Sequence, residues 1–126
     1  MSPRAAGATQ HELSRIGLLA TLSGEALGRL AQRMQREDVP AGAGVIAEGE
    51  EGDRFYAVLS GMFSVTKSGP GARTILRPGD YFGEVALAMN IPRTANVRAL
   101  TPAVVASCDK ATFDEFLRPL FADDEA

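Results

Sequence analysis

The residues best suited to chemistry lie in one short stretch, residues 81–100, which reads YFGEVALAMNIPRTANVRAL. Within it, Gly83 and Glu84 precede a run of helix-forming residues, and Arg93 follows nine residues after Glu84. The first turn of a helix presents N–H groups that have no partner inside the helix, and such groups attract anions. The planar guanidinium of an arginine matches two phosphate oxygens. This pattern predicts a compact phosphate site at the start of a short helix.

The carboxylate of Glu84 would repel an anion unless the two negative groups address different parts of one ligand. A carboxylate accepts hydrogen bonds, so Glu84 suits a sugar hydroxyl. Gly83 permits a close approach of the backbone, and Pro92 fixes the backbone ahead of Arg93. The residues of this stretch therefore indicate an anion site with an adjacent carboxylate that would suit a sugar hydroxyl.

The string FGEVALAMNIPRTANVRAL resembles the phosphate-binding cassette of the cyclic nucleotide-binding domain family, which includes catabolite activator protein, cAMP-dependent kinase regulatory subunits and cyclic nucleotide-gated channels. Upstream, EGEEGDRFYAVLSG and RPGDYFGE resemble the glycine turns and strand edges of the same family, and the resemblance covers most of the chain. It implies cAMP as the ligand, with cGMP as the second candidate, and no catalytic cofactor.

The resemblance also implies a role for individual residues. Glu84 would accept a hydrogen bond from the ribose 2′-hydroxyl, Arg93 would bind the cyclic phosphate, and the backbone N–H groups of Ala86 and Thr94 would complete the phosphate cradle. Gly83 would let the backbone close on the sugar. The residues expected to bind the ligand are Gly83, Glu84, Val85, Ala86, Arg93, Thr94 and Ala95.

Thr94 bears on the choice of base. Many cGMP-responsive members of the family have threonine at this place, whereas many cAMP-specific members have alanine. Thr94 is also a residue of good β-propensity that suits the start of a strand. The preference between cAMP and cGMP therefore stays open.

The elements that must position this stretch begin with helices. Residues 1–10 are small and polar without periodicity, and we expect a flexible arm there. Ser23 stands at an N-cap position, and apolar residues at helical spacing predict an amphipathic helix over residues 24–36, with a shorter helical segment over 13–19 before it. In this interpretation Arg29, Arg33 and Arg36 share one solvated helical face.

From Val39 to Cys108 short apolar or alternating runs are separated by glycine-bearing turns. The runs are VIAE, FYAVLS, MFSVTK, RTIL, ANVRAL and AVVASC, and one of the turns is SGPGA. This spacing predicts a mainly β fold: an antiparallel jelly-roll barrel with N-terminal helices, a short cassette helix and a C-terminal helix. The cyclic nucleotide-binding domain would span residues 11–121, followed by an acidic tail over residues 122–126.

The C-terminal helix should begin after Asp109 as N-cap, and Pro119 should disrupt it. Phe113 and Phe116 recur at helical spacing, which favours packing over contact with a ligand. The cover of the base is left open between a truncated lid, one improvised from Phe121, and one supplied by another chain. Nothing resembling a helix-turn-helix follows the barrel in this sequence.

Composition excludes several classes of function. The chain has 126 residues, a formal charge of −3 and a pI near 5.1, which disfavours nucleic acid as a partner. The single Cys108 excludes an intrachain disulfide and fits a reducing cytosol. The apolar stretches are far shorter than a membrane span, and residues 1–10 lack the apolar core of a signal peptide, so we expect a cytoplasmic location.

The leading hypothesis is a non-enzymatic cyclic nucleotide sensor that transmits its occupancy through the flanking helices to an unidentified effector protein or domain. One alternative is a domain of the same fold that binds a protein and no ligand. The least favoured alternative is a cupin-like metalloenzyme, because the sequence has only one histidine, His11, outside the β region. We therefore expect no catalytic residue and no metal site.

Overall fold

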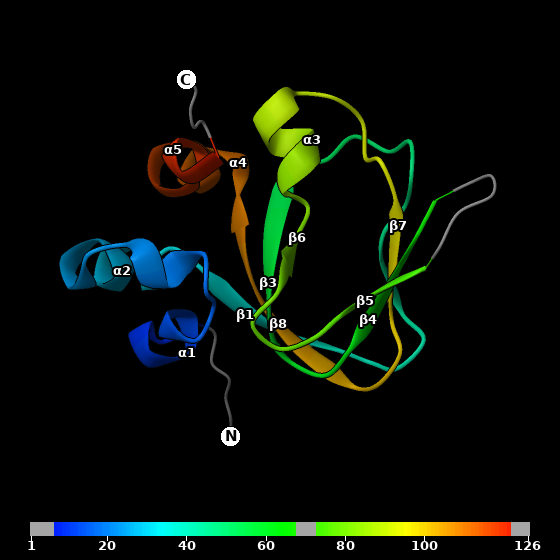
Figure 1. The fold of residues 1–126 in the computed structure, drawn as a ribbon, viewed down its shortest axis with the longest axis horizontal. Helices are drawn as coiled ribbons and strands as arrows, with labels where there is room; N and C mark the ends of the chain where they lie inside the picture. The colour runs from blue at the N-terminus through cyan, green and yellow to red at the C-terminus, as the bar shows by residue number, and fades with distance from the viewer. Residues whose placement is uncertain (1–6, 68–72, 122–126) are drawn as a thin grey trace.

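Two four-stranded antiparallel sheets face each other, and the helices lie against one of them (Figure 1). The computed structural model describes residues 7–67 and 73–121. The first sheet has the strand order β1-β8-β3-β6 and the second the order β2-β7-β4-β5. The strands are β1 (Gln35–Val39), β2 (Gly44–Ile46), β3 (Arg54–Ser60), β4 (Phe63–Thr66), β5 (Thr74–Leu76), β6 (Tyr81–Phe82), β7 (Asn96–Ala99) and β8 (Ala103–Asp109). The predicted mainly β fold is confirmed, as two facing sheets that do not close into a barrel.

The first sheet has an apolar cluster on each face. Along β3, Phe55 and Ala57 point toward the helices, whereas Tyr56 and Val58 point into the space between the sheets. This alternation follows from the period of two residues in a strand. The first sheet is therefore a shared wall between the apolar cluster on the helix side and the apolar cluster between the sheets.

The helices before β1 are shorter than the sequence predicts. They are α1 (Gln10–Ser14), the 3₁₀ turn η1 (Leu19–Thr21) and α2 (Gly24–Ala31), and the Ser23 side chain caps α2 as expected. The helix predicted over 24–36 was wrong beyond residue 31. Residues 35–39 pair along their whole length with β8, and this pairing outweighs the local helical pattern. Arg36 consequently lies on β1, where it pairs with Glu12 at 3.1 Å.

Part of the expected N-terminal arm is ordered. Gly7 forms a bridge to Gln35, and Ala8 is buried. Thr9 and Glu12 form a reciprocal capping box at the start of α1. The fold therefore begins before residue 11, while the rest of the arm (1–6), the SGPGA turn (68–72) and the acidic tail (122–126) lie outside the described residues.

All six predicted runs contain a strand, and the structure adds two that the sequence did not predict. One is β1, whose first two residues were assigned to the end of the predicted helix, and the other is β6, which has two residues. After β6 and Gly83 comes the cassette helix α3 (Glu84–Met89). This helix begins one residue earlier than the run of helix-forming residues, Val85 to Met89, indicates.

The C-terminal helical stretch continues through Pro119, so its predicted disruption there was wrong. It consists of α4 (Lys110–Thr112), the π-helical segment η2 (Phe113–Leu117) and α5 (Arg118–Phe121). The Asp109 side chain accepts a hydrogen bond from the Thr112 N–H, as expected of an N-cap. A proline lacks the N–H that would bond to the carbonyl four residues earlier in an α-helix. The π-helical turn of η2, directly before Arg118 and Pro119, changes this pattern of backbone hydrogen bonds, and the helical stretch continues through the proline. Phe113 and Phe116 are buried in the helical cluster, which confirms their packing role.

Arg118 joins this C-terminal stretch to the cassette helix. Its Nη1 and Nη2 atoms donate to the carbonyl oxygens of Ala88 and Leu87 at 2.9 and 2.8 Å. Its Nε donates to Asp114 at 2.9 Å, which holds the guanidinium in place. A cation at the C-terminus of a helix also opposes the negative end of the helix dipole. The end of α3 is thus fixed directly to α5.

Candidate ligand-binding site

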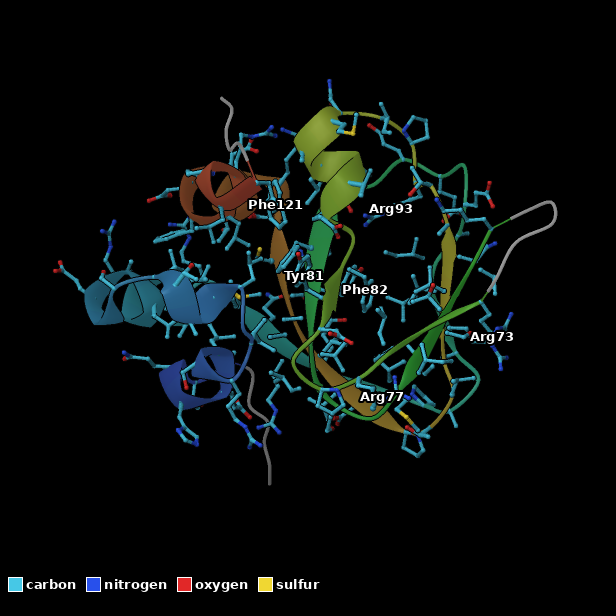
Figure 2. The ribbon with its side chains drawn as sticks, viewed as in Figure 1. Arg73, Arg77, Tyr81, Phe82, Arg93 and Phe121 are labelled. Atoms are coloured by element: carbon cyan, nitrogen blue, oxygen red, sulfur yellow. The ribbon has the colours of Figure 1, made fainter. Side chains whose placement is uncertain are left out.

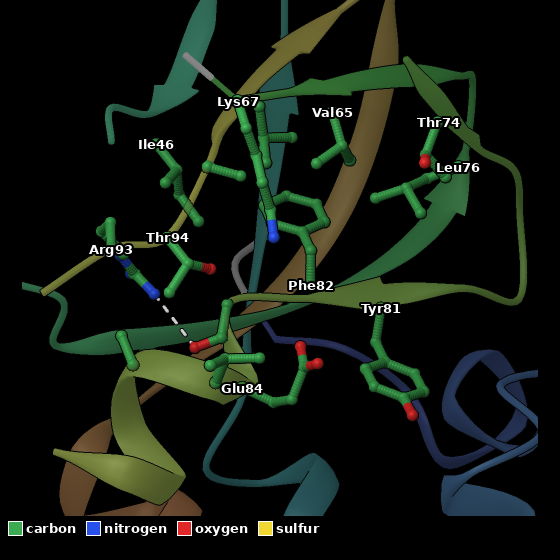
Figure 3. A pocket seen from close by; sticks show the side chains of 15 residues that line it. Ile46, Val65, Lys67, Thr74, Leu76, Tyr81, Phe82, Glu84, Arg93 and Thr94 are labelled. Carbon is green, nitrogen blue, oxygen red and sulfur yellow. Dashed lines mark hydrogen bonds between the residues drawn. The ribbon is translucent and has the colours of Figure 1, made fainter. Parts of the chain in front are cut away.

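A cavity of about 270 Å³ lies between the sheets beside α3 (Figure 3). All seven residues predicted to bind a ligand line it: Gly83, Glu84, Val85, Ala86, Arg93, Thr94 and Ala95. Seven strand residues and Lys67, which directly follows β4, complete the wall and were not in the prediction; the strand residues are Ile46, Val65, Thr74, Leu76, Tyr81, Phe82 and Val97. The structure therefore brings the cassette together as predicted and adds a strand-built half. The contact of each residue with a ligand stays a prediction.

Gly83 holds the turn from β6 into α3. Its φ of 93° lies in the left-handed region, where residues with a Cβ are strained. A Cβ at this position would lie 2.9 Å from the Arg54 carbonyl oxygen and 3.1 Å from Nη1 of Arg93. Both the conformation and the crowding require glycine, which explains how backbone and guanidinium come so close.

Arg93 is held at the edge of this cavity by its own backbone and by two carbonyl groups. Its backbone N–H donates to the Glu50 carbonyl at 2.8 Å. Its Nη1 donates to the carbonyl of Gly83 at 3.0 Å (Figure 3). Its Nη2 donates to the carbonyl of Arg54 at 2.9 Å. The residue is only 8% exposed. A guanidinium has five N–H donors, so three remain beyond these two bonds for the oxygens of an anion.

Burial sets the electrostatics of the two charged groups. Desolvation lowers the pKa of Arg93, against the attraction of Tyr56, Asp53 and Glu84. Desolvation likewise raises the pKa of Glu84, opposed by a hydrogen bond from its own backbone N–H and by the charge of Arg93. Both charges therefore carry a desolvation cost that ligand groups of suitable polarity would offset.

Two further donors belong to the cassette backbone. Ala86 is the third residue of α3, where an N–H has no partner inside the helix. Thr94 follows Arg93 directly, and Figure 3 shows its hydroxyl turned into the cavity. The polar half of the cavity thus combines a cation, a carboxylate, a hydroxyl and the first turn of a helix.

The other half of the cavity is apolar. Val65 and Leu76 lie on β4 and β5, and Phe82 lies on β6. The ring of Phe82 stacks on that of Tyr56 with centroids 4.9 Å apart. Such a surface suits the flat face of an aromatic ligand group.

Comparison with known proteins identifies this arrangement. The family model described as "Cyclic nucleotide-binding domain" matches residues 36–119, which include the whole cassette and every residue of the cavity wall. The chain belongs to the cyclic nucleotide-binding domain family.

Relatives of this cyclic nucleotide-binding domain are regulatory proteins. It is 40% identical over 107 residues to a cAMP-dependent protein kinase regulatory subunit of Debaryomyces hansenii, covering 85% of this chain and 24% of the relative. It is 34% identical over 115 residues to a CRP-like cAMP-activated global transcriptional regulator of Mycobacterium tuberculosis strain H37Rv, covering 88% of this chain and 50% of the relative. The chain therefore spans about a quarter to a half of the relatives it matches.

A solved structure agrees in three dimensions. The regulatory domain of Toxoplasma gondii PKA with cAMP superposes with a TM-score of 0.80 and 30% identity, over 88% of this chain and 44% of that one. The fold of this cyclic nucleotide-binding domain is thus similar to that of a kinase regulatory domain over most of the chain.

Phe121 does not line the cavity of this domain. It packs edge-on against Tyr81 with ring centroids 5.7 Å apart, and it stacks on Phe113 at 5.8 Å (Figure 2). Tyr81 lines the cavity, so Phe121 supports a wall residue from the side of the C-terminal helix. One of the three covers of the base considered from the sequence was a lid improvised from Phe121. In this structure Phe121 acts on the cavity only through its contact with Tyr81.

Sequence reasoning also missed a glycine that bounds the Arg93 side chain. A Cβ on Gly52 would lie 2.5 Å from Nε of Arg93 and 2.7 Å from its Cζ. Gly52 lies in the EGEEGD turn, which was noted only as a turn between strands. The available signal was a second glycine in a turn that already had Gly49.

Neither a metal cluster nor a membrane span is found in the described part of the chain. No group of three or more His, Cys, Asp or Glu side chains there could hold a metal ion. No helix there has the length and apolar character to cross a membrane. The lone Cys108 is buried, and burial raises the pKa of its thiol to about 12.

Proposed function

We propose that this domain is a cyclic nucleotide sensor whose cavity binds cAMP, with cGMP as the second candidate. One observation carries the proposal: a buried guanidinium and a carboxylate share the polar end of a cavity whose other end is apolar. The phosphate would meet Arg93, the ribose 2′-hydroxyl would meet Glu84, and the base would lie against the apolar strands. The two cAMP-responsive relatives and the cAMP-bound neighbour support this assignment.

Transmission is the second part of the proposal. Arg118 ties the end of α3 to α5, so a ligand that pulls the start of α3 inward acts on the C-terminal helix through the same short helix. The readout would pass to an effector protein or domain outside the described residues. We propose no catalytic role and no nucleic acid contact for this domain, and we assign it to the cytoplasm because a chain with a single cysteine fits a reducing compartment.

Calorimetric titration with cAMP, cGMP and 5′-AMP tests the ligand. We expect saturable binding of a cyclic nucleotide, and we expect Arg93→Ala to weaken cAMP by ~2–5 kcal/mol, the range for removing one partner of a buried charge pair. Arg98→Ala is the matched control, because Arg98 carries the same charge on β7, is exposed, and is absent from the cavity wall. An Arg93→Ala variant that binds as tightly as the Arg98→Ala variant would remove the basis of the assignment.

The ribose contact has its own test. Glu84→Gln keeps the shape of the side chain and removes its charge, so we expect a loss of ~1–3 kcal/mol for cAMP. The parent should also bind 2′-deoxy-cAMP more weakly than cAMP, whereas Glu84→Gln should discriminate little between them. If the losses from the substitution and from the missing hydroxyl simply add, Glu84 does not contact the ribose.

The competing function is a protein-interaction domain that has lost its ligand. The presence of both Glu84 and Arg93 at the cavity argues against it. A folded parent that binds none of the three nucleotides would favour this alternative.

A further inference from the structure

Lys67 directly follows β4 and lines the cavity, although its side chain is exposed as in an ordinary surface lysine. Phe63 and Val65 share one face of β4, and Lys67, the first residue after the strand, continues their spacing of two. That face looks into the space between the sheets, because Phe63 is fully buried there and Val65 packs against the same cluster. Figure 3 shows the Lys67 side chain running into the cavity, whose wall also includes Phe82.

The place of Lys67 in the cavity separates it from the phosphate machinery. Arg93 and Thr94 come from the segment before β7, and Glu84 begins α3. Lys67 instead shares its end of the cavity with Val65 and Phe82, where the base would lie. Within the described part of the chain, no ion pair joins its amine to a carboxylate. Lys67 is therefore an exposed cation in the wall of the apolar half of the cavity, where it is available to a polar edge of the base.

The chemistry of an ammonium group decides which base it favours. An ammonium has three donors and no acceptor. Guanine presents two adjacent acceptors, O6 and N7, and lysine is one of the side chains that recognise this pair in other proteins. Adenine presents N7 beside an amino group, which is a donor and opposes a second donor. Lys67 should therefore discriminate between purines at position 6 of the ring.

We propose that Lys67 is a specificity-determining residue that favours cyclic nucleotides with a 6-oxopurine base over cAMP. The proposal rests on the proposed function, because it assigns the base to the strand-built half of the same cavity. It is separate from the role of Thr94, whose hydroxyl would meet the 2-amino group of guanine at the phosphate end. Cyclic inosine monophosphate distinguishes the two residues, since it has O6 and N7 but lacks the 2-amino group.

The test compares cAMP, cGMP and cyclic inosine monophosphate on the parent and on Lys67→Met by calorimetry. Methionine keeps the length and the apolar stem of lysine and removes its donors. We expect the Lys67→Met variant to bind cGMP and cyclic inosine monophosphate about three- to tenfold more weakly than the parent. This loss is toward the low end for a base contact because the lysine is partly solvated. The affinity for cAMP should change by less than about twofold. Lys110→Met is the control: it removes the same charge from α4, outside the cavity wall.

The outcomes separate Lys67 from the binding site as a whole. Equal losses for all three nucleotides, or losses matched by Lys110→Met, would mean that the charge attracts the phosphate from a distance, and would overturn the proposal. Unchanged affinities for the two 6-oxopurines, with normal cAMP binding, would overturn it while leaving the proposed function intact. If the folded parent binds no cyclic nucleotide, the proposed function fails first and the assignment of Lys67 fails with it.

Discussion

Replacing Gly52 by alanine should disable Arg93 without unfolding the domain. The added Cβ would lie 2.5, 2.7 and 2.8 Å from Nε, Cζ and Cδ of Arg93, whereas ordinary contact begins at 3.4 Å. Gly52 is not among the glycines with positive φ, so alanine fits its backbone and the conflict is with the arginine alone. The guanidinium must retreat by roughly 0.9 Å, the difference between 3.4 and 2.5 Å. A shift of this size strains its bonds to the Gly83 and Arg54 carbonyls, which measure 3.0 and 2.9 Å.

The two measurable quantities should respond differently. A flexible side chain can move into the cavity and be solvated there, so the free energy of unfolding should fall by only about 1–2 kcal/mol, at the lower end of overpacking effects. Affinity for cAMP should fall about tenfold to a hundredfold, which is about 1.4–2.8 kcal/mol. The Gly52→Ala variant should not bind cAMP more weakly than the Arg93→Ala variant does. Gly17→Ala is the control, because nothing lies within 4 Å of its added Cβ and its φ is not positive.

A double-mutant cycle shows whether Gly52 acts through Arg93. In the Arg93→Ala background the obstructed side chain is absent, so Gly52→Ala should cost almost no further affinity. Calorimetry on the four proteins, with thermal melts to monitor folding, gives the coupling. Additive losses, or a Gly52→Ala variant that binds like the parent, would refute the steric reasoning.

Three other perturbations follow from the contacts described. Glu84→Gln should raise the melting temperature at neutral pH: burial raises the pKa of Glu84, so its contribution to stability is present at acidic pH and is lost as the pH rises through that pKa. The difference between variant and parent should vanish in acid, and a constant difference would contradict this origin. Asp109→Ala removes the cap on the Thr112 N–H and should lower the free energy of unfolding by ~0.5–2 kcal/mol in urea titrations, while Asp109→Asn retains most of it. Arg118→Met removes two charged hydrogen bonds to α3 and should cost ~1–3 kcal/mol by the same titration, and a variant as stable as the parent would show that these bonds add nothing.

The polar half of the cavity could be predicted because its residues are close in sequence. Gly83, Glu84 and Arg93 lie within eleven consecutive positions, and a short helix with a turn suffices to bring them together. The chemistry of a carboxylate beside an arginine is visible without knowing the fold. Resemblance to the family then supplied the ligand.

The strand-built half could not be predicted, because its residues look like ordinary core. Val65 and Leu76 meet the cavity only because β4 pairs with β5 and β7 in one particular register. A shift of one residue would turn Val65 and Lys67 to the opposite face. Register is a long-range property that a single sequence does not display.

Strand β1 shows how long-range pairing overrides local pattern. Four of its five residues, Gln35 to Asp38, are polar or charged, and the sequence around them continues a helical spacing. The segment becomes a strand because β8 offers it a free edge over five paired positions. Within the segment itself, only the buried Val39 indicates that it pairs with another strand.

The shared wall between the two apolar clusters makes the domain one cooperative unit. Strands β3 and β8 supply side chains to both clusters, so neither cluster can come apart while the other keeps its lining. Whatever binds the native cavity more tightly than the unfolded chain therefore stabilises the helices on the far side of the wall as well. No residue of α2 lines the cavity, yet the amide hydrogens of this helix should exchange more slowly as a ligand is added, because their slowest exchange requires opening of the shared sheet.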